Sequence, residues 1–214
     1  MSAPVQRQRI VVGIAGASGT VYGTRLVEQL VHHNWEVHLL VSTSTWKVMQ
    51  AELGIVGASP STPLTDWLRV SGQQVRDQIH TYNIRDIAAP MASGTFRARG
   101  MIIIPASMKT VAAIAHGYSD NLLTRCADCF LKERRPLVVV PRETPLSSIH
   151  LRNLLTLSEA GAHIVPAMPG FYHNPASIDD LVNFMVTKVL NLLDIDHDVA
   201  MEWQGMHPTN EVKD

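Results

Sequence analysis

An arginine and a glutamate stand side by side where an apolar run ends, in the segment "LKERRPLVVVPRETP" at positions 131–145. Arg142 and Glu143 directly follow the run "LVVVP", and Lys132 precedes it. A guanidinium binds phosphate oxygens through charge-assisted hydrogen bonds, and a neighbouring carboxylate can act as a general acid or base. The pattern therefore indicates an anion site with a proton carrier. The alternative interpretation of Glu143 is a simple ion pair with a nearby arginine.

Three glycines interrupt a second apolar run in "IVVGIAGASGTVYG", positions 10–23, and a helical pattern follows at once. A strand, a glycine turn and a helix N-terminus form a common phosphate site, because the amide N–H groups of the turn point at the anion. The spacing of Gly13, Gly16 and Gly19 fits neither the dinucleotide pattern G-x-G-x-x-G nor the P-loop. We therefore favour a mononucleotide such as FMN. Close packing of a helix on a strand is the alternative explanation of the glycines.

Hydroxyl-rich turns follow two other apolar runs. The turn "VSTST" at 41–45 contains Ser42 but no carboxylate, whereas a dinucleotide site needs an acidic residue there for the ribose. The turn "PASMKT" at 105–110 brings Ser107, Lys109 and Thr110 to the start of a helical pattern, which is another anion site. Together these turns predict a cleft of nucleotide size.

Apolar, β-branched runs alternate with amphipathic patterns along the whole chain. Because the apolar runs are continuous, they indicate strands buried on both faces. We predict one doubly wound, Rossmann-like (flavodoxin-like) α/β domain, with a parallel sheet, helices on both faces, a core at 9–194 and a tail at 195–214. The expected strands are 9–15, 36–42, 79–83, 100–107, 136–141 and 162–167, and the expected helices are 20–33, 44–53, 108–116, 120–134, 147–160 and 178–193. Between 54 and 100 we otherwise expect a surface excursion.

Composition excludes several classes of protein. The 214 residues are 46% hydrophobic with a net charge of −1, which argues against a general binder of nucleic acid or membrane surfaces. No run approaches the ~20 apolar residues of a membrane span, and the polar start "MSAPVQRQR" lacks the features of a signal peptide. We therefore expect a cytoplasmic protein without a membrane span.

The sequence contains two cysteines, Cys126 and Cys129, spaced as C-x-x-C within a helical pattern. No second pair completes a zinc site, so we interpret both as small buried residues, with a redox or metal role as the alternative. The histidines show no metal-ligand spacing such as H-E-x-x-H, and we predict no metal. In "GFYHNP", Tyr172 can donate to a phosphate oxygen and present an apolar face, while His173 braces the turn.

Four segments resemble the UbiX-type flavin prenyltransferases: "GIAGASGTVYGTRL", "PASMKT", "DNLLTRCADCFLKERRPLVVVPRETP" and "PGFYHNPASIDDLV". The resemblance extends over about residues 9–205. It implies that reduced FMN is alkylated by dimethylallyl monophosphate to give prenylated FMN, with a new ring joining N5 and C6. It also implies delivery of the product to a UbiD-type decarboxylase, in ubiquinone synthesis or aromatic-acid decarboxylation. A metal-independent homododecamer with active sites at subunit boundaries is implied as well.

Matched position by position, the resemblance implies three sets of site residues. FMN would contact Gly16, Ala17, Ser18, Ser42, Ser107, Met108, Lys109, Thr110, Arg125 and Arg142. The prenyl phosphate would contact Lys132, Arg142, Glu143, Tyr172, Lys188 and Trp203. Catalytic roles would fall to Glu143, Lys132, Ser18, Glu52 and Tyr172, with Ser18 between the two substrates. Two positions depart from the family pattern: Lys188 is often arginine, and Ile87 stands where some members have an aromatic residue lining the prenyl pocket.

Two other functions fit parts of the sequence. A flavin-dependent decarboxylase of the peptidyl- or phosphopantothenoyl-cysteine type shares the "PASxxT" turn, but its P-x-M-N-x-x-M-W signature is absent. A flavoprotein that stores FMN or delivers it to a decarboxylase would share the FMN turns. Such a protein would have no use for Lys132, Glu143 and Tyr172 as a second phosphate site.

Overall fold

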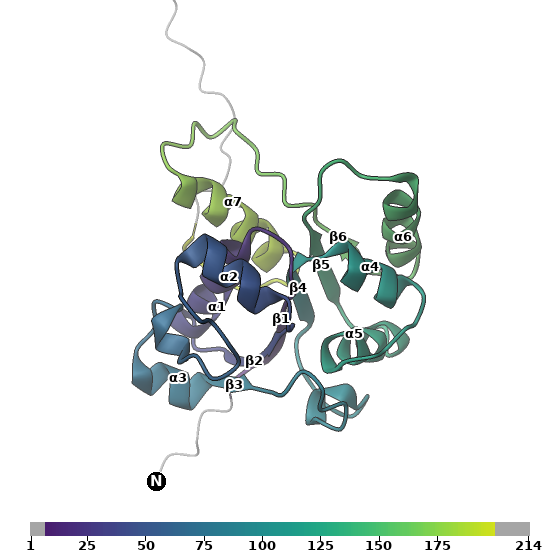
Figure 1. Cartoon of the computed structure of the whole chain (residues 1–214), viewed down its shortest axis with the longest axis horizontal. Coiled ribbons are helices and arrows are strands. Elements are labelled where there is room, and N and C mark those ends of the chain that lie inside the picture. Colours follow the sequence, from purple (N-terminus) through teal and green to yellow (C-terminus); the bar gives the residue numbers. More distant parts are fainter. Residues whose placement is uncertain (1–6, 200–214) are drawn as a thin grey trace, which may run out of the picture.

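The computed structural model describes residues 7–199, and in this part of the chain six parallel strands form one sheet in the order β3-β2-β1-β4-β5-β6 (Figure 1). The strands are β1 (Arg9–Ile14), β2 (Glu36–Val41), β3 (Ile79–Thr81), β4 (Met101–Ala106), β5 (Leu137–Pro141) and β6 (His163–Ile164). The helices are α1 (Thr20–His32), α2 (Thr45–Leu53), α3 (Gly72–Gln78), α4 (Met108–Ala115), α5 (Leu122–Lys132), α6 (Ser148–Glu159) and α7 (Ile178–Asn191). Short 3-10 turns lie at Leu64–Asp66 and Pro90–Ala92.

Two separate cores cover the two faces of the sheet. Side chains of a strand alternate between faces, so in β4 Ile102 and Ile104 join one core while Met101 and Ile103 join the other. Helices α1, α2, α3 and α7 pack on the first face, and α4, α5 and α6 pack on the second (Figure 1). This arrangement confirms the predicted doubly wound, parallel α/β fold. No helix within residues 7–199 is long and apolar enough to cross a bilayer.

Side-chain caps determine where several helices begin. Ser177 accepts a hydrogen bond from the Asp180 amide (3.2 Å), and the Asp180 carboxylate accepts from the Ser177 amide (2.9 Å). This reciprocal pair of hydrogen bonds is a capping box, and α3 and α6 begin with the same arrangement at Ser71 and Ser147. A cap of this kind is worth about 1 kcal/mol, so these short polar residues fix the first turn of each helix.

The region 54–100 is more ordered than the sequence indicates. The prediction of a surface excursion with one strand missed α3 and the burial of Trp67 and Leu68, which are 7% and 3% exposed. The polar composition of α3 hides its helical period, although Ser71 and Gln74 form a recognisable capping box. The expected strand 162–167 is also shorter, because β6 pairs with β5 only at His163 and Ile164.

The order of the strands has a switch point between β1 and β4. After β1 the chain moves outward to β2, and it later returns to place β4 on the other side of β1. The connections from β1 and β4 therefore leave in opposite directions. Ligands of doubly wound folds bind at this switch point, outside the carboxyl ends of the strands.

Candidate active site

A row of backbone hydrogen bonds joins the carboxyl ends of neighbouring strands. The amide of Ser42, after β2, donates to the last carbonyl of β1 (3.0 Å), and the amide of Ala15 donates to β4 (3.0 Å). The amide of Arg142, after β5, donates to the last carbonyl of β4 (3.2 Å). These hydrogen bonds place the glycine loop beside the turns after β2, β4 and β5 at the carboxyl ends of the strands. All of these segments were predicted to bind an anion.

The glycine loop lies against the turn after β2. A Cβ on Gly16 would lie 2.1 Å from the hydroxyl oxygen of Ser44, so this close approach needs a glycine. Behind it, the Thr45 hydroxyl donates to the last carbonyl of β1 (2.7 Å) and lies 2.9 Å from the Ser42 hydroxyl. Thr45 was not among the predicted site residues. It is the last residue of the hydroxyl-rich turn "VSTST", and this position could have marked it as part of the site.

Glu52 binds the N-terminus of α1. Its carboxylate accepts hydrogen bonds from the amides of Gly19 (2.9 Å) and Thr20 (2.9 Å) and from the Thr20 hydroxyl (2.8 Å). Burial raises the pKa of Glu52, but hydrogen bonds from Ser18, Thr20 and Gly19 outweigh burial, and the pKa lies below its usual value. Because Glu52 already occupies these amides and the Ala17 amide donates to the Ala15 carbonyl (2.8 Å), a phosphate in this loop must use the amides of Gly16 and Ser18.

The turn after β4 lies beside the glycine loop at the switch point. Ser107 caps α4, and its hydroxyl lies 3.0 Å from the Thr110 hydroxyl. Of the other two predicted residues in this turn, Met108 is buried and Lys109 is exposed. The turn therefore offers two hydroxyls and the free amides at the start of α4 to an anion.

Arg142, just after the carboxyl end of β5, has a hydrogen-bond donor without a partner in the described part of the chain. Its Nε is buried and has no hydrogen-bond partner within the described residues. Such a donor is costly unless something binds it, and an anionic or carbonyl oxygen would satisfy it. The adjacent Glu143 is half-buried and accepts from the Thr144 amide (3.0 Å). Between residues 7 and 199 no cation lies within ion-pair distance of Glu143, so the ion-pair interpretation is not realised within one chain.

Tyr172 and Lys188 both lie against the aromatic ring of Phe184. The Tyr172 ring packs edge-on against Phe184, with centroids 5.7 Å apart, and the Lys188 ammonium lies 5.5 Å from the same ring. His173 stacks on Phe184 at 5.1 Å, which agrees with a bracing role. Phe184 was missed by the sequence analysis, although its position four residues before Lys188 on α7 places both on one helix face.

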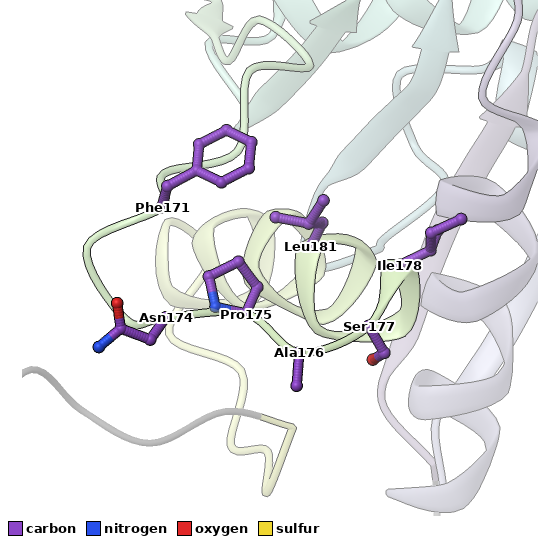
Figure 2. Close-up of a pocket in the computed structure, with 7 residues that line it drawn as sticks. All are labelled: Phe171, Asn174, Pro175, Ala176, Ser177, Ile178 and Leu181. Atoms are coloured by element: carbon purple, nitrogen blue, oxygen red, sulfur yellow. The ribbon is translucent and has the colours of Figure 1, made fainter.

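An open groove of about 610 Å³ lies next to this cluster. It runs between the loop after β6 and the first turns of α7 (Figure 2). Phe171 and Ile178 are 66% and 76% exposed, so its walls are apolar surface open to solvent. The groove is lined by Phe171, Asn174, Pro175, Ala176, Ser177, Ile178 and Leu181.

Similarity to known proteins shows which family the chain belongs to. A family profile described as "Flavoprotein" matches residues 2–190. The flavin prenyltransferase UbiX of Alkalihalophilus pseudofirmus is 48% identical over 195 residues, which are 90% of this chain and 94% of the relative. The chain belongs to the UbiX flavin prenyltransferase family.

Solved structures of related proteins have the same fold. AnUbiX (PadA1), in complex with FMN and dimethylallyl pyrophosphate, has a TM-score of 0.80 and 42% identity, covering 94% of this chain and 100% of that one. A dodecameric FMN-dependent UbiX-like decarboxylase from Escherichia coli O157:H7 has a TM-score of 0.78 and 40% identity, covering 92% and 100%. These likenesses confirm the resemblance inferred from the sequence motifs.

One predicted site residue of this flavin prenyltransferase, Lys132, lies apart from Glu143. Lys132 ends α5, before β5 begins, and its ammonium lies 2.5 Å from Glu133. Glu143 follows the other end of β5, and a strand of five residues is about 17 Å long. Arg125 pairs with Asp128 on α5 (3.0 Å). A single chain therefore does not bring Lys132 to Glu143, and Trp203 lies outside the described residues.

The C-x-x-C pair of this prenyltransferase lies inside the protein. Cys126 and Cys129 are both free thiols and fully buried. Burial raises the pKa of Cys126 to about 12, which keeps it in the unreactive thiol form. The interpretation of both cysteines as small buried helix residues is confirmed.

Proposed function

We propose that this chain binds reduced FMN at the carboxyl edge of the sheet and joins it to the dimethylallyl group of dimethylallyl monophosphate, through N5 and C6. The observation that carries the proposal is the Arg142–Glu143 pair beside the two anion-binding turns, with a buried guanidinium Nε that lacks a partner. The product is prenylated FMN. Membership of the prenyltransferase family and the relative bound to FMN and dimethylallyl pyrophosphate support this reaction.

The residues at the carboxyl ends of β1, β2, β4 and β5 suit FMN. The Gly16 and Ser18 amides can donate to a phosphate, and Ser42, Ser107 and Thr110 add hydroxyls. Arg142 supplies a donor for a flavin or phosphate oxygen. The bound flavin supplies the nucleophilic nitrogen and carbon to which the prenyl group is joined.

The remaining residues suit an allylic phosphate. Breaking its C–O bond leaves negative charge on the phosphate, which Lys188 and Arg142 can stabilise as cations. The face of Tyr172 can stabilise positive charge on the allyl group. Glu143, which has no cationic partner within the described part of its own chain, is available to exchange the protons that two new bonds require.

Lys132 completes the phosphate site from another subunit. It lies one strand length from Glu143 in its own chain, while the family resemblance assigns both residues to one active site. A homododecamer with active sites at subunit boundaries reconciles these observations, and a UbiX-like relative is dodecameric. The exposed apolar side chains Phe171 and Ile178 are suitable for such contacts.

A UbiD-type decarboxylase is the proposed recipient of the product. Prenylated FMN is a modified cofactor, so a second enzyme must use it. We propose the cytoplasm as the place of the reaction, which the two free thiols support because reducing compartments keep cysteines unpaired.

Mass spectrometry of the flavin tests the reaction. The purified chain is incubated without oxygen with reduced FMN and dimethylallyl monophosphate, and the flavin is then extracted. We expect FMN to gain one five-carbon prenyl unit, and this product to activate a UbiD-type decarboxylase. Recovery of unmodified FMN, under conditions in which the relative from A. pseudofirmus modifies it, would support the storage protein instead.

A further inference from the structure

Three potential metal ligands meet at the amino end of β2, far along the strand from Ser42. Glu36 and His38 are two residues apart on β2, and alternation places them on the same face of the sheet. The register pairs His38 with His80 on the neighbouring strand β3. Two strands therefore bring two imidazoles and a carboxylate together by pairing alone.

The spacing of the three ligand atoms suits one small cation. The Glu36 Oε1 lies 3.2 Å from the His38 Nε2 and 3.3 Å from the His80 Nε2, and all three ligand atoms lie within 4.8 Å of one another. In a tetrahedral zinc site with bonds of about 2.1 Å, neighbouring ligand atoms are about 3.4 Å apart. His80 is 42% exposed, so its ring has room to turn toward a shared cation.

His38 is oriented for binding by a residue behind it. Its side chain is 5% exposed, and its Nδ1 lies 2.7 Å from the Tyr82 hydroxyl. Its Nε2 is buried without a hydrogen-bond partner in residues 7–199, because the contact with Glu36 lacks hydrogen-bond geometry. A histidine ligand usually has its second nitrogen held in this way, which fixes the ring and leaves the first nitrogen for the metal.

We propose that Glu36, His38 and His80 bind a divalent transition metal, with Zn²⁺ as the best fit, at a site separate from the prenyl transfer site. Two histidines and a carboxylate are a known zinc ligand set, with a water completing the tetrahedron. The metal links β2 to β3, the edge strand of the sheet. Its proposed role is structural. This proposal departs from the prediction of no metal that was made from the sequence.

The electrostatics of the site permit a cation. Glu36 supplies a carboxylate to the site, and its negative charge attracts a cation. Arg9 contacts the Glu36 carboxylate, with Nε 3.3 Å from each oxygen, and adds a positive charge beside the site. Because the Arg9 side chain is 40% exposed, water screens this charge, and we expect moderate affinity.

Metal titration of the purified full-length chain tests the proposal. Zn²⁺ alone is titrated calorimetrically in a buffer without phosphate, and Co²⁺ is used as a coloured probe of geometry. We expect one metal per chain and the visible absorption of four-coordinate Co²⁺. His80→Ala and Glu36→Gln should each weaken binding by at least about tenfold. His163→Ala, which removes an exposed histidine from the opposite edge strand, should change nothing.

The same titration contains the results that overturn the proposal. Absence of one-to-one binding, six-coordinate Co²⁺, or equal affinity in His80→Ala would each do so. A second cluster of potential ligands, His32, His33 and Asp198, is tested with His33→Ala. If His33→Ala loses metal binding while His80→Ala keeps it, the metal binds at that cluster and the proposal is refuted. If a variant is unstable, the Co²⁺ spectrum of the unaltered chain still tests the proposal, because a four-coordinate spectrum supports it and a six-coordinate spectrum overturns it. Prenyl transfer by His80→Ala should equal that of the unaltered chain, which separates this test from that of the proposed function.

Discussion

The two ends of β2 gather polar groups in different ways. At the carboxyl end, Ser42 belongs to a row of turns and helix starts from successive strands, which offers amides and hydroxyls to an anion. At the amino end, Glu36 and His38 belong to the strand itself and meet His80 through strand pairing, which offers lone pairs to a cation. The same parallel sheet thus builds a proposed anion site from its connections and a proposed cation site from its register.

The largest expected effect comes from Glu143→Gln at the carboxyl end. The amide keeps the shape of the side chain but cannot carry a proton, so prenyl transfer should fall by at least about a hundredfold while FMN stays bound. Flavin absorbance of the purified protein and mass spectrometry of the extracted flavin measure the two effects. Glu159→Gln, at the end of α6, is the control. If Glu143→Gln loses FMN, the residue is structural.

Mixed oligomers test whether the carboxyl-end site is shared between subunits. Lys132→Ala and Glu143→Gln should each be inactive alone, because every site lacks one residue. When both are co-expressed, a site takes Lys132 from one copy and Glu143 from another, so about a quarter of the sites regain both residues. Activity near that fraction is the expected result. If Lys132 acts within its own chain, no mixed site contains both residues and activity stays absent.

The comparison of the two ends also explains what the sequence could predict. The glycine loop, the Ser42 turn, the Ser107 turn and Arg142 lie in continuous segments that follow strands, so the doubly wound fold was sufficient to place them together. The Glu36, His38 and His80 cluster depends on the register of β2 with β3. Register follows from packing of the whole sheet, and no spacing along the chain reveals it.

Other features have related physical explanations. The proposed place of Lys132 in the active site depends on another subunit, although in sequence it is only ten residues from Arg142. Helix α3 is polar on most of its surface, so its hydrophobic period is weak and only its capping box marks it. Phe184 lies in a helix that is rich in apolar core residues, so nothing in the sequence pattern distinguishes it, and its contacts with Tyr172 and Lys188 come from tertiary packing.

Gly16→Ala is expected to have a smaller effect, on FMN affinity. The added Cβ would lie 2.1 Å from the Ser44 hydroxyl oxygen and 2.6 Å from its Cβ, so the turn after β2 must move. Overpacking of this kind costs about 1–3 kcal/mol, equivalent to roughly five- to 150-fold weaker FMN binding if the free loop can relax. Fluorescence titration of FMN measures it.

Gly72→Ala is the matched control for this substitution. At Gly72, the first residue of α3, the nearest side-chain atom lies 3.6 Å from an added Cβ, so alanine fits there. We expect it to leave FMN affinity unchanged. Equal FMN affinity in Gly16→Ala and Gly72→Ala would show that the glycine loop serves only helix packing, which was the alternative drawn from the sequence.

The smallest expected effect concerns Glu52, which stabilises the glycine loop without a ligand. Its folded-state pKa lies below the usual 4.5, because hydrogen bonds from Ser18, Thr20 and Gly19 outweigh its burial. The ionised form therefore adds stability above the unfolded-state pKa, and this stability is lost as the pH falls through the folded-state pKa. Glu52→Gln should lower the free energy of unfolding by less than about 1 kcal/mol at pH 7, because the side chain is partly exposed. Urea unfolding should show this difference shrinking below pH 4, and a difference that persists there would mean that shape rather than charge holds the α1 N-terminus.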